Sequence, residues 1–472
     1  MYFHSLQFLA FLVVSHALYW AVHRCKAARL GVLLLASLAF YAAWSPFPIL
    51  IFVWCAVVDF LAVKGMARWQ RPAVRKLLLA VSVVSDIGVL CTFKYADLFY
   101  STAAWLLGRV GIEVRYEPLG LLLPIGLSFV CFQAVSLVVD VYRGQLEPKQ
   151  GFFEHLLFLL FFPQVVAGPI VRAKDLLARF GETPVLDSDA GVRGIYRIAI
   201  GIAKKLLVAD LIAAGLVDRV FAEPTLYSSA ECLMATIGYT LQLYFDFSAY
   251  SDIAIGAAAL FGFKLPENFN KPYLARNLFE FWNRWHISLS TWLRDYVYIP
   301  LGGNRRSRPR VLLNLMIVMT VGGLWHGADW RFALWGAIHG VGLVIIRCYW
   351  WLIGGRPKQH TLLGSAAGIV ATFAVVVFTR IVFRASDLTM ARVMFERLLE
   401  FSPGLANVSV PVWIAMGAAL VGHYLPHRAF SLSADLFARL PAPVRATALV
   451  ALGLAIRKVG MVEVRPYIYF QF

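Results

Sequence analysis

The chain has 472 residues, of which 60% are hydrophobic and only 15% carry a charged side chain. This composition is far more apolar than that of soluble globular domains, so it excludes a water-soluble protein. Apolar runs at residues 30–63, 77–93, 119–139 and 363–378 approach or exceed the roughly 20 residues that a membrane-crossing helix requires. The sequence therefore predicts an all-α, polytopic membrane protein.

The positive charges predict its orientation. Lys and Arg total 44 against 27 Asp and Glu, and they gather in alternate loops. The loop at residues 24–29 carries three, the loop at 45–48 carries none, and the segment 64–76 carries five. By the positive-inside rule the N-terminus lies outside the cell membrane and the basic loops lie in the cytoplasm, where they favour anionic lipid headgroups. The charge therefore indicates contact with membrane lipids rather than with nucleic acid.

Hydropathy divides the chain into apolar helices without a separate soluble domain. Residues 2–22 follow no basic segment and lack a small-residue cleavage site, so we expect a retained helix rather than a signal peptide. We expect a single membrane domain over residues 1–472, with about 11–13 membrane helices or re-entrant segments. The six cysteines stand singly, without metal-type spacing, and are expected to be reduced packing residues. The expected helices are 4–22, 30–44, 47–63, 77–93, 119–139, 153–171, 195–217, 231–262, 311–324, 333–352, 363–383, 409–425 and 441–456.

Residues 239–339 are unusually polar for such a chain. Gln242, Asp246 and Asp252 lie inside an otherwise apolar segment. An ionisable residue at membrane depth is a functional-site hypothesis by default, because it normally faces a protein interior or a water-filled cavity. A helix cap, or an ion pair with one of the many arginines, explains the two aspartates equally well.

A Trp-rich segment follows at residues 279–296. Wound as one helix, it places His286 on an apolar face with Trp282, Trp285 and Trp292, whereas its polar residues share the other face. Such a helix suits the membrane interface or the mouth of a cavity. Taken alone, His286 is more simply explained as a buried histidine bonded to a neighbouring carbonyl group.

The next apolar run is predicted to break over residues 322–330, where glycines stand on both sides of His326. Glycines let the backbone leave a regular helix and let a substrate approach the imidazole ring. Neither His286 nor His326 has a histidine partner at i,i+4, so no metal site is predicted. A neutral imidazole in a partly desolvated pocket can take a proton from a hydroxyl group near neutral pH. His339, by contrast, is expected to serve only packing or hydrogen bonding.

A basic turn lies between these two segments. It contains Arg305, Arg306, Arg308 and Arg310. The charges favour a cytoplasmic topology determinant, and contact with a phosphorylated donor is the alternative.

Several long motifs in this order resemble the membrane-bound O-acyltransferase family, and within it the membrane subunits of bacterial polysaccharide O-acetylation systems. Asn283 is a departure, because relatives commonly have an arginine there, which affects only a local basic contact. The matching segments are FPQVVAGPIVR at 162–172, QLYFDFSAYSD at 242–252, PENFNKPY at 266–273, WHISLSTWLRDY at 285–296, LGGNR at 301–305, GGLWHGA at 322–328 and YIYFQF at 467–472.

The resemblance implies a helical bundle around a transmembrane tunnel, in which re-entrant segments bring two histidines towards a constriction. It implies that His326 is the catalytic histidine and His286 a second functional position, and so reverses the simpler explanation of each. Asp246, Asp252, Gln242, Asn268, Trp325 and Arg305 are then expected to bind or orient substrate.

The resemblance also implies an O-acetyltransferase that binds no cofactor. It would take acetyl groups from a cytoplasmic donor, acetyl-CoA, and pass them across the membrane. A separate periplasmic subunit would place them on an exported polysaccharide, either alginate, cellulose or peptidoglycan. The alternative from another class is a proton-coupled transporter or flippase of a polar or lipid-linked solute, with the aspartates and histidines as a proton relay. The chain shows neither a Walker loop nor the internal repeat that a transporter often carries.

Overall fold

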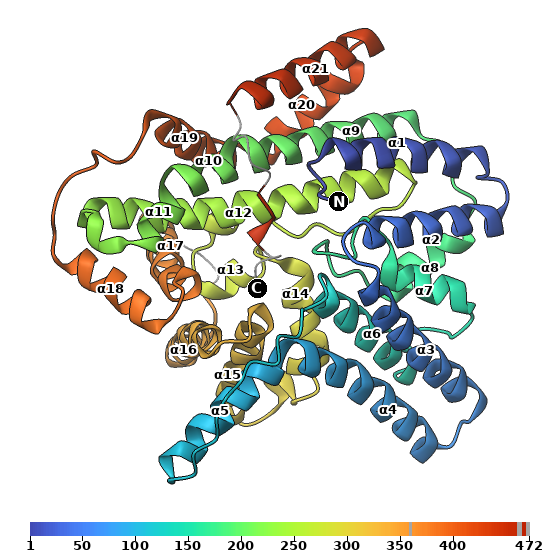
Figure 1. Cartoon of the computed structure of the whole chain (residues 1–472), viewed down its shortest axis with the longest axis horizontal. Coiled ribbons are helices and arrows are strands. Elements are labelled where there is room, and N and C mark those ends of the chain that lie inside the picture. Colours follow the sequence, from blue (N-terminus) through green and yellow to red (C-terminus); the bar gives the residue numbers. More distant parts are fainter. Residues whose placement is uncertain (358–360, 460–464, 469–472) are drawn as a thin grey trace. The chain divides into compact units, whose positions relative to one another are not determined.

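The computed structural model describes residues 1–357, 361–459 and 465–468, and these residues form helices and loops without a β-strand. The predicted all-α class is confirmed (Figure 1). The chain divides into two compact units, Met1–Asp187 with Ala257–Pro266, and Ser188–Gly256 with Glu267–Phe472. The single domain expected over residues 1–472 stays a prediction. The motif at 467–472 falls outside the described residues from position 469 onward.

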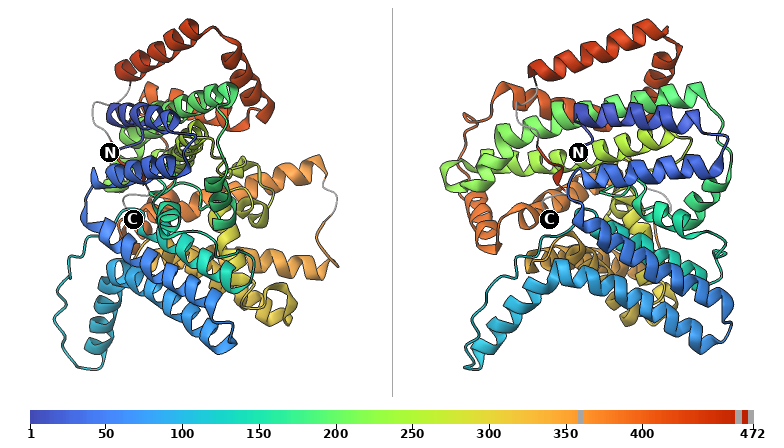
Figure 2. Two further views of the ribbon diagram at one scale, coloured as in Figure 1. Left: turned by 90° about the vertical axis from the view of Figure 1, so that its right-hand side faces the viewer. Right: turned by 45° about the vertical axis from the view of Figure 1, so that its right-hand side comes forward.

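The first unit is built around one helical pair. Helices α3 and α4 lie side by side and both pack against α6, as the two views of Figure 2 show. Proline in the first turn favours the start of both α3 and α4, because its missing N–H would have no helical partner there. The helices are α1 (Leu6–Ala21), α2 (Lys26–Ala42), α3 (Phe47–Arg68), α4 (Pro72–Leu90), α5 (Ala96–Arg109), α6 (Leu127–Tyr142), α7 (Phe152–Leu160) and α8 (Ala173–Gly181), with the π-turn η1 (Cys91–Tyr95) joining α4 to α5.

The second unit holds most of the polar stretch. Its helices are α9 (Ser188–Ala203), α10 (Asp210–Ile212), α11 (Asp218–Ala222), α12 (Ser229–Leu260, whose last turn belongs to the first unit), α13 (Leu278–Trp282), α14 (Ile287–Leu293), α15 (Arg308–His326), α16 (Trp330–Leu352), α17 (Leu362–Arg384), α18 (Leu388–Leu399), α19 (Val410–Tyr424), α20 (His427–Arg439) and α21 (Ala442–Val459). Short π-helices lie among them, η2 (Lys204–Ala209), η3 (Ala213–Val217) and η6 (Arg294–Tyr298), as do 3-10 helices, η4 (Pro224–Leu226), η5 (Pro272–Leu274) and η7 (Gly303–Arg305).

Four stretches of the described residues are long and apolar enough to cross a membrane: Phe47–Arg68, Pro72–Arg109, Trp330–Leu352 and Leu362–Arg384. Helices α1, α6 and α19 are apolar but shorter. The apolar helices confirm the predicted membrane protein. All six cysteines are free thiols, as expected.

Several predicted helix boundaries were wrong. The helix expected at 119–139 begins only at Leu127, because Pro124 and the left-handed Gly126 (φ 81°) hold a turn before it. The helix expected at 153–171 ends at Leu160, and the one at 195–217 contains two π-turns. Conversely, the helix expected at 77–93 continues beyond that range to Arg109.

The break predicted over residues 322–330 is shorter than expected, because Gly322 and Gly323 stay helical and only residues 327–329 leave the helix. Helix α15 runs through both glycines and ends at His326. The glycines instead let α15 and α16 pack closely, because a Cβ on Gly323 would lie 2.2 Å from the carbonyl oxygen of Phe332. A Cβ on Gly336, in α16, would lie 2.3 Å from the carbonyl oxygen of Met319. Small residues at a helix interface in membranes commonly serve this close approach.

Candidate functional site

The continuous helix predicted over residues 279–296 is instead two short helices, α13 and α14, with His286 in the turn between them. His286 adopts a left-handed backbone (φ 42°) that a residue with a side chain rarely takes. The preceding loop supports this turn, because the N–H of Ile287 donates to the carbonyl oxygen of Asn268 at 2.9 Å. The N–H of Asn270 likewise donates to the carbonyl oxygen of Arg284 at 2.9 Å. These long-range bonds offset the local strain.

Asn268 fixes the turn through its side chain as well. Its Oδ1 accepts from the backbone N–H of Ser288 at 3.2 Å and from the Ser288 hydroxyl at 2.9 Å. Its Nδ2 donates to the Ser251 hydroxyl, on α12, at 3.4 Å. Asn268 is buried, so each of these bonds is shielded from water. The side chain therefore positions His286 rather than merely filling space.

We expect Asn268→Ala to lower acyl transfer more than it lowers stability. The substitution leaves two donors of Ser288 without their acceptor, at a cost of about 1–3 kcal/mol each, and loosens the turn that holds His286. Asn268→Asp keeps the acceptor oxygen and should recover part of the activity. Initial rates and thermal unfolding of both variants check this, and equal activity losses in the two would contradict a positioning role.

The structure brings His286 and His326 to the same aromatic residue. His326 is the buried last residue of α15, and its ring centroid lies 5.1 Å from that of Trp325. The ring of His286 lies 5.7 Å from the same Trp325. Thus two segments forty residues apart meet across one indole, which the sequence motifs alone did not show.

Aromatic rings enclose both histidines. Phe247 packs edge-on against His286 at 4.7 Å between centroids, and Trp335 and Phe383 each lie 5.3 Å from His326. The His286 side chain is fully buried, and burial disfavours the charged imidazolium. A neutral imidazole in an apolar pocket can accept a proton or donate one hydrogen bond.

Sequence reasoning missed one residue of this site, Arg380 on α17. Its guanidinium carbon lies 4.8 Å from the ring centroid of Trp285 and 5.3 Å from that of Phe383, and the side chain is buried. The signal was present, because Arg380 is a charge inside an apolar run of membrane-spanning length. His339, on α16, donates to or accepts from the Thr379 hydroxyl at 3.1 Å, which confirms the hydrogen-bonding role expected for it.

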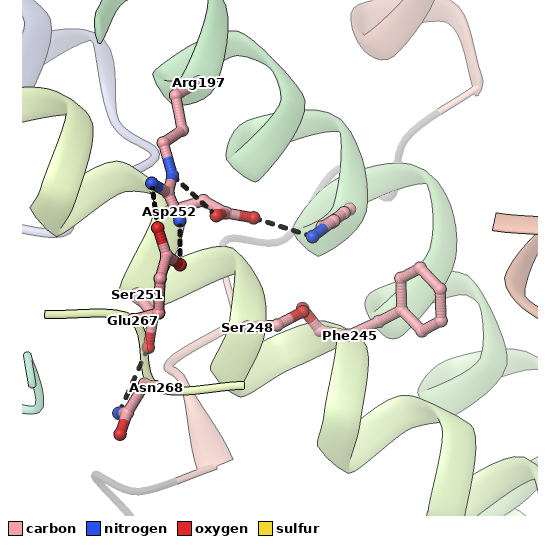
Figure 3. Close-up of polar contacts among 8 residues, drawn as sticks. Arg197, Phe245, Ser248, Ser251, Asp252, Glu267 and Asn268 are labelled. Carbon is pink, nitrogen blue, oxygen red and sulfur yellow. Dashed lines mark hydrogen bonds and ion pairs between the residues drawn. The ribbon is translucent and has the colours of Figure 1, made fainter. Parts of the chain in front are cut away.

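The two aspartates make the ion pairs that the sequence left as an alternative. Asp252 accepts from Arg197 at 2.9 Å and from Lys204 at 2.6 Å, and Arg197 also reaches both oxygens of Glu267 (Figure 3). Asp246 is buried against Lys205 at 2.7 Å, and its other oxygen accepts from the backbone N–H of Ile468 at 2.9 Å.

The remaining sequence-predicted residues are dispersed. Gln242 is buried in α12, and Arg305 is exposed on the η7 turn. A cavity of about 1200 Å³ in the second unit has Asn268 and Asp252 in its wall. Neither His286 nor His326 is among its lining residues, although Ile287, next to His286, is. Among the described residues no three His, Cys, Asp or Glu side chains are placed to hold a metal ion.

Comparison with known proteins identifies the family. The sequence profile of MBOAT, the membrane-bound O-acyltransferase family, matches residues 87–352, a stretch that contains both histidines. The chain belongs to this family. It is therefore an O-acyltransferase, in agreement with the resemblance of its motifs.

The similar proteins named below act on different polymers. The "Probable alginate O-acetylase AlgI" of Pseudomonas aeruginosa is 39% identical over 374 residues, covering 78% of this chain and 69% of that protein. The peptidoglycan O-acetyltransferase of Helicobacter pylori is 34% identical over 406 residues, covering 80% and 74%. The teichoic acid D-alanyltransferase of Streptococcus thermophilus is 31% identical over 306 residues, covering 58% and 72%. All three names describe transfer of an acetyl or alanyl group to a polymer.

Proposed function

We propose that this protein is an inner-membrane O-acetyltransferase that passes acetyl groups from cytoplasmic acetyl-CoA towards an exported polysaccharide of the alginate type. The observation that carries the proposal is the meeting of His286 and His326 on Trp325, inside the region that matches the family. The similar alginate and peptidoglycan acetylases support an exported polymer as the destination. A separate periplasmic subunit completes the transfer to the polymer.

In the proposed reaction, His326 accepts the proton of the attacking hydroxyl group as its oxygen bonds to the thioester carbonyl carbon. The carbon–sulfur bond then breaks, and the departing thiolate of CoA takes up the proton. His286 orients the acceptor or stabilises the charge that develops on the carbonyl oxygen. General base catalysis of this kind contributes about 10²–10⁴-fold, and a narrow buried site adds proximity.

The transporter alternative receives no support from the acidic residues. A proton relay through Asp246 and Asp252 requires carboxyl groups that can release and rebind protons. Each of them instead forms an ion pair with a lysine or arginine within 3 Å.

Consumption of the thioester tests the proposed function. Purified protein with labelled acetyl-CoA and an acceptor or the partner subunit should release free CoA and transfer the label. A matched preparation of His326→Ala should release CoA only at the background rate. Label transfer from another acyl donor, with none from acetyl-CoA, would overturn the choice of donor but not the enzyme class.

The predicted orientation has its own test. The segment 64–76, which contains the loop between α3 and α4, should be cytoplasmic because it carries five Lys or Arg. The short loop before α3 carries none and should be periplasmic. Single cysteines at Ser45 and Gln70, in a background without the six native cysteines, report the side of each loop. Labelling of position 70 but not of position 45 by a membrane-impermeant reagent on intact spheroplasts would reverse the orientation.

The exposed basic turn offers a separate prediction. If Arg305 and its neighbours only set topology, replacing the four arginines at 305, 306, 308 and 310 by glutamine should lower insertion or abundance and leave the donor KM unchanged. If they hold the phosphates of CoA, the donor KM should rise and activity should become less sensitive to salt, because exposed charge contacts are screened. We expect the topological result, and a raised KM in correctly inserted protein would contradict it.

A further inference from the structure

The cavity in the second unit is polar at one end and apolar at the other. The cavity is lined by one continuous helical stretch, α9, η2 and α10. Arg193, Arg197 and Lys204 lie on its lining face, and Leu207 and Leu211 follow them there. Spacings of three, four and seven residues keep all five on one side of this helical stretch. The cavity lining thus changes from charged to apolar along this helical stretch.

Helix α19 runs in the opposite sense along the same cavity. Its start is apolar and packs at the leucine end, since a Cβ on Gly215 would lie 2.3 Å from Cγ2 of Val412. Pro411, Ile414 and Ala418 line the cavity there. Its end carries His423, whose electrostatic neighbours are Lys271 and Lys204. The lining residues of α9 and of α19 therefore place the polar side chains at the same end of the cavity.

The polar end carries an excess of positive charge. Four cationic side chains line the cavity, Arg193, Arg197, Lys204 and Lys271, against two lining carboxylates, Asp252 and Glu267. Arg193 pairs with a third carboxylate, Asp435, so four positive charges face three negative ones. Arg197 donates hydrogen bonds to both lining carboxylates, and the Lys204 ammonium group donates one to Asp252. The Lys271 ammonium group donates to the backbone carbonyl of Leu425, which carries no compensating charge. The charge balance of the walls fits an anionic group.

His423 supplies a second, independent sign of a ligand. Its side chain is 2% exposed, it lines the cavity, and neither ring nitrogen has a hydrogen-bond partner in the structure. The rings of Tyr244 and Tyr273 each lie 4.9 Å from it and fix its orientation. Buried polar atoms in proteins nearly always have a partner, so one is expected to come from the occupant of the cavity.

We propose that this cavity binds an anionic phospholipid, with its phosphate among Lys204, Lys271 and His423 and an acyl chain along Leu207, Leu211 and Ile414. A volume of about 1200 Å³ exceeds the usual range of drug-sized pockets, which suits a long molecule with two chemically different parts.

The neighbouring helix favours a lipid over a soluble phosphate compound. Helix α20 packs on α9 and lines the polar end through His427, Phe430, Ser431 and Ala434, while Leu432 and Leu436 on it are more than half exposed. An amphipathic helix with exposed leucines and terminal arginines is typical of the membrane interface, where phosphate headgroups lie. The phosphate end of the cavity therefore lies beside a helix suited to headgroup depth.

The lipid site would adjoin the turn that holds His286. Asn268 lines the cavity and accepts the hydrogen bonds of Ser288, and Ile287 lines it too. A bound lipid would thus contact the residue that positions His286. The proposal stands on the cavity alone and does not depend on the identity of the acyl donor.

Native mass spectrometry of the purified full chain tests the lipid site. After delipidation and addition of equimolar phosphatidylglycerol and phosphatidylcholine with identical chains, we expect retention of phosphatidylglycerol. The double variant Lys204→Gln, Lys271→Gln should lower that retention about tenfold. The charge-matched control, Arg294→Gln with Arg392→Gln, replaces two exposed arginines outside the cavity and should retain the lipid as the native chain does.

Two further arms keep the result interpretable. Ala418→Trp fills the apolar end of the cavity without changing its charge and should also lower retention of phosphatidylglycerol. If thermal unfolding shows that loss of Lys204 disturbs folding, Lys271→Gln alone replaces the double variant. Equal retention of both lipids by the native chain would overturn the phosphate site. Displacement of phosphatidylglycerol by CoA at lower concentration than by added phosphatidylglycerol would assign the cavity to a soluble phosphate compound and overturn the lipid.

Discussion

Replacement of His326 by alanine is expected to lower acyl transfer by about 10²–10⁴-fold while the protein stays folded and inserted. The imidazole packs against Trp325, Trp335 and Phe383, so its loss leaves a small gap among rigid rings and should lower the unfolding temperature by only a few degrees. The neighbouring residues cannot replace His326 in proton transfer, because indole and phenyl rings are not bases.

Polymer acetylation in cells and CoA release by purified protein measure this effect. The matched control is His155→Ala, a buried histidine of α7 in the other compact unit, which should affect stability but not the chemical step. His286→Ala should also impair activity strongly, because His286 shares Trp325 with His326. Normal acetylation by well-expressed His326→Ala would refute the assignment, and tolerance of both substitutions would return the two histidines to a packing role.

The sequence identified both histidines but not how they meet. Motif resemblance named His286 and His326, and Trp325 entered as one orienting residue among several. That Trp325 lies against both rings depends on the end of α15 and the α13–α14 turn, which are distant in sequence. The 3.6-residue helical period could not predict this turn, because no glycine marks its left-handed position, His286. The turn is held instead by hydrogen bonds to residues 268 and 270.

The polar residues show the same limit in another way. Sequence placed Asp246 and Asp252 at membrane depth and left open whether they were functional groups or ion-pair partners. Their partners lie about forty or more residues earlier, at Lys205, Lys204 and Arg197, and an apolar pattern does not specify which cation faces which acid. Membrane-spanning character was predictable, since it follows from composition and run length alone.

Loss of the Lys205 ammonium group should have the largest effect on stability. Its side chain is 1% exposed, and Nζ lies 2.7 Å from Asp246 and 2.9 Å from Asp210. Lys205→Met would leave two buried carboxylates without a counter-charge, which typically costs about 3–5 kcal/mol. It would also remove the donor to the carbonyl oxygen of Pro466 and the cation over the ring of Tyr467, so the segment 465–468 should become easier to cleave by protease.

Thermal unfolding in detergent and limited proteolysis measure the two effects, with an exposed pair as control. Arg392 and Glu396 form an i,i+4 pair on α18 whose side chains are 80% and 52% exposed, so Arg392→Met should change the unfolding temperature little. The unfolding temperature of Asp246→Asn should lie between those of Lys205→Met and Arg392→Met. The amide still offers an oxygen to the N–H of Ile468, and Lys205 keeps its ion pair with Asp210. Equal losses for Lys205→Met and Arg392→Met would show that the buried pair is no more important than a surface one. A large loss confined to Lys205→Met would instead assign these charges to holding the fold, because the energy of a buried ion depends chiefly on keeping its partner.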